Sequence, residues 1–228
     1  MSEKIKKGAW VWLGRLDYRP AMRLMNSITS KVEQGEPGCL MLLEHSPVIT
    51  LGHRETGANI ILPEEELQKR GIEVERADRG GLATYHGPGQ LVGYLVFRLA
   101  DLAGTIHELT YKLEGILIRL AASMDVHAAR RKGLPGVWVK GDKLASIGMR
   151  VRKGIVGHGF SFNLHPNMKN FEYIISCGIQ GAGAVSIESV SGSTPRVEEA
   201  AHRVIHLFQE SFGILLERDN KRRALDEI

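Results

Sequence analysis

The twelve-residue run at positions 79–90, RGGLATYHGPGQ, constrains the fold more than any other segment of the chain. Its four glycines let the backbone approach a ligand closely and turn N–H groups inward, at a cost in conformational entropy. The apolar residues 91–97 follow at once and predict a buried strand. A glycine-rich loop beside a core strand indicates a binding site. Gly87-Pro88-Gly89 alone would also fit a tight hairpin turn.

Length and composition predict one soluble globular domain. The 228 residues suffice for one substantial core and are too few for three domains. We find no repeat or linker, and expect a single domain over residues 1–228 with a mobile, charged tail from about residue 217 to 228. No apolar run approaches the ~20 residues of a membrane span, and residues 10–13 are too short for a signal-peptide core. We therefore expect a cytoplasmic protein that does not associate with membranes.

Charge and cysteine usage narrow the function classes. The net charge is +4, yet the chain lacks the Lys/Arg runs of nucleic-acid binders, so we expect no nucleic-acid partner. Mild basicity would speed encounter with a small acidic protein. Cys39 and Cys177 lie far apart, which favours reduced thiols over a disulfide framework. The common zinc motifs are absent from the sequence, and no metal is expected.

The periodicity of apolar residues predicts an α+β domain, with a strand meander and a few helices on one face. Helices are expected over residues 20–34, 63–70 and 105–123, and from residue 194 onward. Strands are expected over residues 10–13, 39–44, 48–51, 91–97, 136–140, 144–151 and 155–163.

The glycine-rich run also resembles the signature of the lipoyl (octanoyl) transferases. The shared pattern is Arg-Gly-Gly, two variable residues, Thr-Tyr-His, two more, Gly-Gln, and then Tyr94. This resemblance implies a single catalytic domain with the fold of the biotin and lipoate protein ligases, a mixed, largely antiparallel sheet flanked by helices.

The resemblance further implies an acyltransferase of lipoate biosynthesis in the cytoplasm. Such an enzyme moves an octanoyl group from acyl carrier protein to a lysine of a lipoyl domain. The donor would be carried on the phosphopantetheine of acyl carrier protein, and no other cofactor is expected. Acceptors would be lipoyl domains of 2-oxoacid dehydrogenase complexes or the glycine cleavage H protein.

Two residues are candidates for catalysis. Cys177 precedes three glycines within six residues, which would leave the thiol uncrowded and backbone N–H groups free to face an oxyanion. Cys39, at the start of an apolar run, has the character of a core residue. From local sequence, Cys177 could equally be an inert thiol, but the resemblance implies a Cys-Gly nucleophile there. It also implies a neighbouring lysine, here Lys143, that helps the thiol to lose its proton. The resulting thiolate would then form the acyl thioester. The alternative for Lys143 is a solvated turn residue.

Substrate-binding residues are expected in three segments. These are Arg79, Gly80, Gly81, Leu82, Ala83, Thr84, Tyr85 and His86 in the glycine-rich run, Ser146, Ile147 and Gly148 after Lys143, and Gly159, Phe160 and Ser161 in the sequence HGFSFN. We expect Thr84 and Tyr85 to line an acyl pocket, and Gly159 to let the acyl chain or pantetheine arm pass close to the backbone.

The individual roles of Arg79, His86 and His158 stay open at this point. Arg79 is expected either to anchor the loop or to contact an anionic group of the phosphopantetheine. His86 is expected to orient Cys177 or Lys143, or to brace the loop. His158 is expected either to bond a backbone carbonyl or to contact substrate.

Three other functions compete with the transferase. An ATP-dependent lipoate or biotin protein ligase would share the fold and need no cysteine nucleophile, and the Cys177-Gly178 pair argues against it. An octanoyl amidotransferase would also use a cysteine, and the sequence separates it less cleanly. A non-catalytic acyl- or carrier-binding module is disfavoured because both Cys177 and Lys143 are present.

Overall fold

The structure is a computed structural model that describes residues 6–175 and 183–219. Its strands are β1 (Lys6–Leu16), β2 (Cys39–His45), β3 (Val48–Leu51), β4 (Glu73–Arg76), β5 (Ala83–His86), β6 (Gln90–Val96), β7 (Ala129–Arg131), β8 (Leu134–Val139), β9 (Asp142–Arg152), β10 (Ile155–Asn163) and β11 (Ile214–Arg218). Its helices are α1 (Tyr18–Glu33), α2 (Glu64–Lys69), α3 (Leu99–Leu102), α4 (Ile106–Ala122), the 3₁₀ helix η1 (Met168–Tyr173), α5 (Ile187–Ser191) and α6 (Val197–Phe212).

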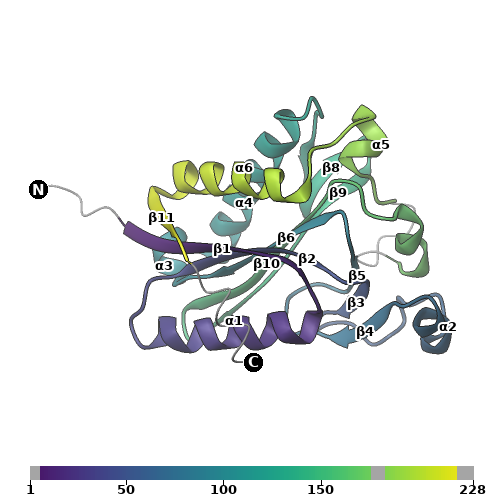
Figure 1. The fold of residues 1–228 in the computed structure, drawn as a ribbon, viewed down its shortest axis with the longest axis horizontal. Coiled ribbons are helices and arrows are strands. Elements are labelled where there is room, and N and C mark those ends of the chain that lie inside the picture. Colours follow the sequence, from purple (N-terminus) through teal and green to yellow (C-terminus); the bar gives the residue numbers. More distant parts are fainter. Residues whose placement is uncertain (1–5, 176–182, 220–228) are drawn as a thin grey trace, which may run out of the picture.

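The described strands form two sheets (Figure 1). The large sheet has eight strands in the order β11-β1-β2-β6-β10-β9-β8-β7, and the small one has three in the order β4-β3-β5. In the large sheet β1 pairs in parallel with β11 and β2, while the other neighbours pair antiparallel. The expected α+β architecture with a mixed, largely antiparallel sheet is confirmed.

Helices cover both faces of the large sheet (Figure 1), so the expectation of helices on one face was wrong. Strand β2 shows the reason. Leu40 and Leu42 belong to the core under α4 and α6, whereas Met41 and Leu43 belong to the core under α1. An unbroken apolar strand, unlike an alternating one, buries both of its faces and needs cover on each side.

Element boundaries follow local signals. Helix α4 begins after Thr105, whose hydroxyl accepts a hydrogen bond from the backbone N–H of Glu108, as N-caps do.

The charged tail was expected to begin at Glu217, but Glu217 and Arg218 end strand β11, which pairs in parallel with β1. The rest of that tail from residue 220 lies outside the described residues. Among the described helices, none has the length and apolar character to cross a membrane.

The glycine-rich run is not one continuous loop. Residues 83–86 form β5 of the small sheet, whereas Gln90 begins β6 of the large one. The turn at residues 87–89 therefore connects two sheets and does not close a hairpin. Gly89 has φ +86°, and a Cβ there would lie 2.5 Å from the carbonyl oxygen of His165. The run thus crosses the junction between the sheets, and this places its side chains in the space between them.

Candidate active site

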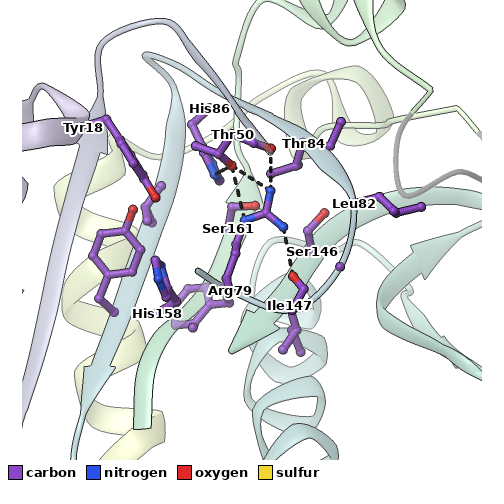
Figure 2. A pocket seen from close by; sticks show the side chains of 18 residues that line it. Tyr18, Thr50, Arg79, Leu82, Thr84, His86, Ser146, Ile147, His158 and Ser161 are labelled. Carbon is purple, nitrogen blue, oxygen red and sulfur yellow. Dashed lines mark hydrogen bonds between the residues drawn. The ribbon is translucent and has the colours of Figure 1, made fainter. Parts of the chain in front are cut away.

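A pocket lies where the glycine-rich run meets strands β6, β9 and β10 (Figure 2). It is lined by Tyr18, Thr50, Arg79, Gly80, Gly81, Leu82, Ala83, Thr84, His86, Val92, Tyr94, Ser146, Ile147, Gly148, His158, Gly159, Phe160 and Ser161. All of the expected substrate-binding residues except Tyr85 are among them. The three expected segments meet because β9 and β10 pair antiparallel, which sets Ser146 opposite Ser161 and Gly148 opposite Gly159.

Tyr85 was expected in the pocket wall but lies on the other side of β5. Successive side chains of a strand point to opposite faces, so Tyr85 turns away where Thr84 and His86 face the pocket. Its ring meets Phe171 edge-on at 5.2 Å, and its hydroxyl accepts a hydrogen bond from Nδ2 of Asn170 at 2.7 Å. Tyr85 therefore holds η1 against the small sheet.

Gly159 lines the pocket as expected, but its missing side chain does not leave room for a ligand. A Cβ at this position would lie 2.2 Å from the carbonyl oxygen of Gly93 and 2.7 Å from Cδ1 of Leu95. The close approach of β6 to β10 therefore requires the glycine.

Arg79 anchors the glycine-rich run to the small sheet. Its Nη2 donates to the backbone oxygen and to Oγ1 of Thr50, both at 2.7 Å, and its Nη1 donates to the backbone oxygen of Gly80 at 3.0 Å. The side chain is buried and lines the pocket. These contacts support the anchoring role, and a contact with a phosphopantetheine anion stays a prediction.

His86 is braced from both ring nitrogens. Nδ1 lies 2.7 Å from Oε1 of Gln90, and Nε2 lies 3.4 Å from Oγ1 of Thr50. Burial, together with the neighbouring His45 and Arg79, lowers the pKa of His86 to about 3. The imidazole is therefore neutral near pH 7, and its Nδ1–H donates to Gln90. This arrangement supports the bracing role.

His158 ties the start of the glycine-rich run to β10. Its Nε2 lies 2.6 Å from Oδ1 of Asp78, the residue before Arg79, and Asp78 also pairs with Arg150. Burial is the main cause that lowers the pKa of His158 to about 3, so the neutral Nε2–H donates to the carboxylate. The hydrogen-bond partner of His158 is therefore the carboxylate of Asp78 and not the backbone carbonyl that was one of the two expectations. His158 has φ +58°, a left-handed conformation rare outside glycine.

Lys143 is a buried residue of β9, and this excludes the solvated-turn alternative. Its Nζ lies 4.6 Å from the centroid of the Trp138 ring, a cation–π contact. Its backbone N–H donates to the oxygen of Gly183 at 2.9 Å, and its own oxygen accepts from the N–H of Val185 at 3.0 Å. Lys143 is not part of the pocket wall, but it precedes Ser146 by three residues on the same strand.

Cys177 lies outside the described residues, but the chain on either side of it is placed. Before it, the N–H of Ile175 donates to the oxygen of Asn59 at 2.8 Å. After it, the N–H of Gly183 donates to Oδ1 of Asp142 at 2.9 Å. The segment that contains Cys177 therefore ends beside Lys143. Cys39 is buried at the start of β2, as expected of a core residue.

Sequence reasoning missed four residues of the pocket wall, and it left the role of a fifth, His158, undecided. Thr50 and Tyr18 carry no local signal, because only the fold brings the end of β3 and the start of α1 to the glycine-rich run. Val92 and Tyr94 lie in a strand that was expected to be buried, and their spacing of two puts them on one face. Within residues 6–175 and 183–219, no three His, Cys, Asp or Glu side chains gather as metal ligands.

The sequence of the chain matches known proteins. The sequence model of the family "Lipoyl protein ligase A/B catalytic domain" matches residues 17–209. An octanoyltransferase from Caldicellulosiruptor bescii is 39% identical over 219 residues, which cover 94% of this chain and 96% of that protein.

Solved structures share the fold at low sequence identity. A lipoate-protein ligase A bound with ATP superposes with a TM-score of 0.78 at 16% identity, over 97% of this chain and 93% of that one. A biotin protein ligase from Aquifex aeolicus superposes with a TM-score of 0.55 at 12% identity, over 90% of this chain and 70% of that one. These likenesses confirm the expected biotin and lipoate protein ligase fold.

Proposed function

The chain belongs to the lipoyl protein ligase A/B catalytic-domain family, and on this premise we propose that it is an octanoyltransferase of lipoate biosynthesis. The curated relatives that carry this name match nearly the whole chain, which supports the same acyltransferase activity here. The donor in this proposal is octanoyl-acyl carrier protein, and the acceptor is a lysine of a lipoyl domain or of the glycine cleavage H protein.

The observation that carries the proposal is the placement of Lys143. It is a buried lysine that lies three residues from the pocket wall at Ser146, and its backbone is hydrogen-bonded to Gly183 and Val185, where the chain continues after the segment that contains Cys177. A thiol reacts as its thiolate and needs a neighbouring base or cation. A buried lysine at the end of the cysteine segment fits that need, and the adjoining pocket fits the acyl chain.

In the first step, the Cys177 thiolate attacks the carbonyl carbon of the octanoyl thioester. The tetrahedral intermediate expels the phosphopantetheine thiolate, which takes up a proton from the Lys143 ammonium. The product is an octanoyl-Cys177 thioester and a neutral Lys143 amine. One thioester replaces another, so the step is close to balanced.

In the second step, the acceptor lysine attacks the same carbonyl carbon as a neutral amine. Its displaced proton passes to Lys143, the carbon–sulfur bond to Cys177 breaks, and an amide forms. Amide formation drives the sequence forward. The reaction as written needs no cofactor beyond the acyl-bearing phosphopantetheine, and it predicts ping-pong kinetics.

The test is intact mass with peptide mapping after the protein is mixed with octanoyl-acyl carrier protein in the absence of ATP. We expect an octanoyl adduct on Cys177 that a lipoyl domain discharges. The Cys177→Ala variant should form no adduct, and Cys39→Ala serves as the matched control that still does. Lys143→Ala should slow both formation and discharge of the adduct.

Three outcomes would overturn the proposal in different ways. Transfer from free octanoate that requires ATP would assign the activity of a ligase, as in the lipoate-protein ligase A whose structure superposes at a TM-score of 0.78. Unchanged transfer by Cys177→Ala would remove the covalent route. An octanoyl adduct formed from an octanoylated lipoyl-domain protein but not from acyl carrier protein would assign an amidotransferase.

A further inference from the structure

The pocket has a near end and a far end relative to Lys143. Along the ladder between β9 and β10, Ser146 lies opposite Ser161 and Met149 lies opposite His158. Lys143 precedes Ser146 on β9, so His158 marks the end of the pocket away from Lys143. In Figure 2, Tyr18 and His158 lie on one side of the pocket, with Ile147 and Leu82 on the other.

The hydroxyl of Tyr18 faces the far end of the pocket. Within the described residues this hydroxyl has no hydrogen-bond partner, and the ring packs at 5.5 Å from that of His45. Arg150 Nε is the sole described side-chain nitrogen or oxygen that is fully buried without a partner. The Tyr18 hydroxyl is therefore not sealed inside the protein. Since the residue is 4% exposed and lines the pocket, its open surface faces that pocket.

The same reasoning places Nδ1 of His158 at the pocket. Nε2 of this ring donates to Asp78, whereas Nδ1 has no partner among the described residues and is not sealed off either. Burial raises the pKa of Tyr18 to about 12 and lowers that of His158 to about 3. At neutral pH the far end thus offers one O–H donor and one nitrogen acceptor.

The walls between the two ends suit an alkyl chain. Val92, Ile147 and Phe160 supply apolar surface, and Gly148 exposes backbone. From Ser146 to Met149 the strand advances three residues, about 10 Å at the usual rise. An extended octanoyl chain has a similar length, so its methyl end reaches the neighbourhood of Tyr18 and His158 when its carbonyl lies near Ser146.

We propose that Tyr18 and His158 set the upper limit of acyl-chain length by closing the far end of the pocket with polar atoms. This inference rests on the proposed octanoyl transfer. A chain longer than octanoyl would push methylene groups over a hydroxyl and a ring nitrogen that water can satisfy and an alkyl group cannot. The discrimination therefore comes from unsatisfied polar groups, with Tyr18 as the specificity-determining side chain that can be changed without disturbing a hydrogen bond.

The test compares decanoyl with octanoyl transfer in wild type and in Tyr18→Phe. The variant should raise the ratio of decanoyl to octanoyl kcat/KM by about tenfold, the effect of removing one unsatisfied hydroxyl. Because that hydroxyl makes no hydrogen bond within the described protein, Tyr18→Phe should fold with unchanged thermal stability.

Tyr94→Phe is the matched control. It removes a hydroxyl from the same region, but this hydroxyl donates to Nε2 of His45 at 2.6 Å. The control should lower stability and leave the ratio of decanoyl to octanoyl transfer unchanged. An equal rise of the ratio in both variants would refute the specific role of Tyr18.

A binding measurement separates this inference from the proposed function. Calorimetric titration with octanoic and decanoic acid needs no catalysis, and Tyr18→Phe should favour decanoic acid by the same factor. If the chain-length preferences in binding are as predicted but the wild-type protein transfers neither acyl group, the proposed function alone would be contradicted. Octanoyl transfer with an unchanged chain-length ratio in Tyr18→Phe would overturn this inference alone.

Discussion

Acidification from pH 7 to 5.5 should destabilise the protein through three buried histidines. Burial is the main cause that lowers the pKa of His45 to about 4 and those of His86 and His158 to about 3, from an ordinary value of 6.5. Between those values the unfolded chain binds more protons than the folded protein, so stability falls as the pH falls below 6.5.

The magnitude follows from linkage. For one histidine the loss is RT ln(1 + 10^(6.5 − pH)), which is about 0.2 kcal/mol at pH 7 and about 1.4 kcal/mol at pH 5.5. Each residue therefore removes about 1 kcal/mol over this range, and the three together remove about 3–4 kcal/mol. Domains of this kind are typically stable by about 5–15 kcal/mol, so the change is a large part of the total.

The assay is urea unfolding at pH 7.0, 6.5, 6.0 and 5.5 at constant ionic strength. This range lies above the titration of most carboxylates, so their contribution stays small. In His158→Gln the amide can still donate to Asp78 but does not titrate, and the pH dependence should fall by about one third. A free energy of unfolding that stays constant from pH 7 to 5.5, or an identical slope in the variant, would refute the reasoning.

Three further changes have definite expected outcomes. Gly159→Ala should lower the free energy of unfolding by about 1–3 kcal/mol, because the new Cβ would lie 2.2 Å from the oxygen of Gly93, and urea unfolding measures this. Asp78→Ala should cost about 1–3 kcal/mol, because it leaves a buried imidazole N–H without an acceptor, and octanoyl transfer should slow as the glycine-rich run loosens. Tyr85→Phe should cost about 1 kcal/mol through the lost bond to Asn170, and an altered chain-length preference in this variant would contradict its placement outside the pocket.

The sequence was a good guide to the wall of the pocket because its signals are local. The glycine-rich run, the residues after Lys143 and the HGFSFN segment each carry unusual composition, and strand pairing brings them together. Tyr85 was misplaced because the run was treated as a loop. Once residues 83–86 form a strand, alternation alone turns that side chain away from its neighbours.

Other features depend on contacts that are distant in the sequence. Tyr18 is the first residue of α1, and Thr50 lies near the end of β3 in the small sheet. No spacing in the sequence predicts that both line the same pocket as Arg79. Local sequence likewise predicts neither the left-handed φ of His158 nor its contact with a carboxylate 80 residues away. The cover on both faces of β2 was readable in principle from its unbroken apolar run, but the strand meander was taken to have helices on one face.

The anchoring of the chain around Cys177 has a consequence for how this fold can be re-engineered. Ile175 is held by Asn59, in the loop that follows β3 of the small sheet, whereas Gly183 and Val185 are held by β9 of the large one. The placement of the chain on either side of Cys177 is therefore not set by a single loop that could be grafted elsewhere. In a chimera that exchanges the small sheet and its loop for those of a relative, the contact of Ile175 would come from the relative. The contacts of Gly183 and Val185 with β9 would stay as they are. Only exchanges that preserve the hydrogen bond from Ile175 to Asn59 keep the arrangement that the proposed pair of Cys177 and Lys143 needs.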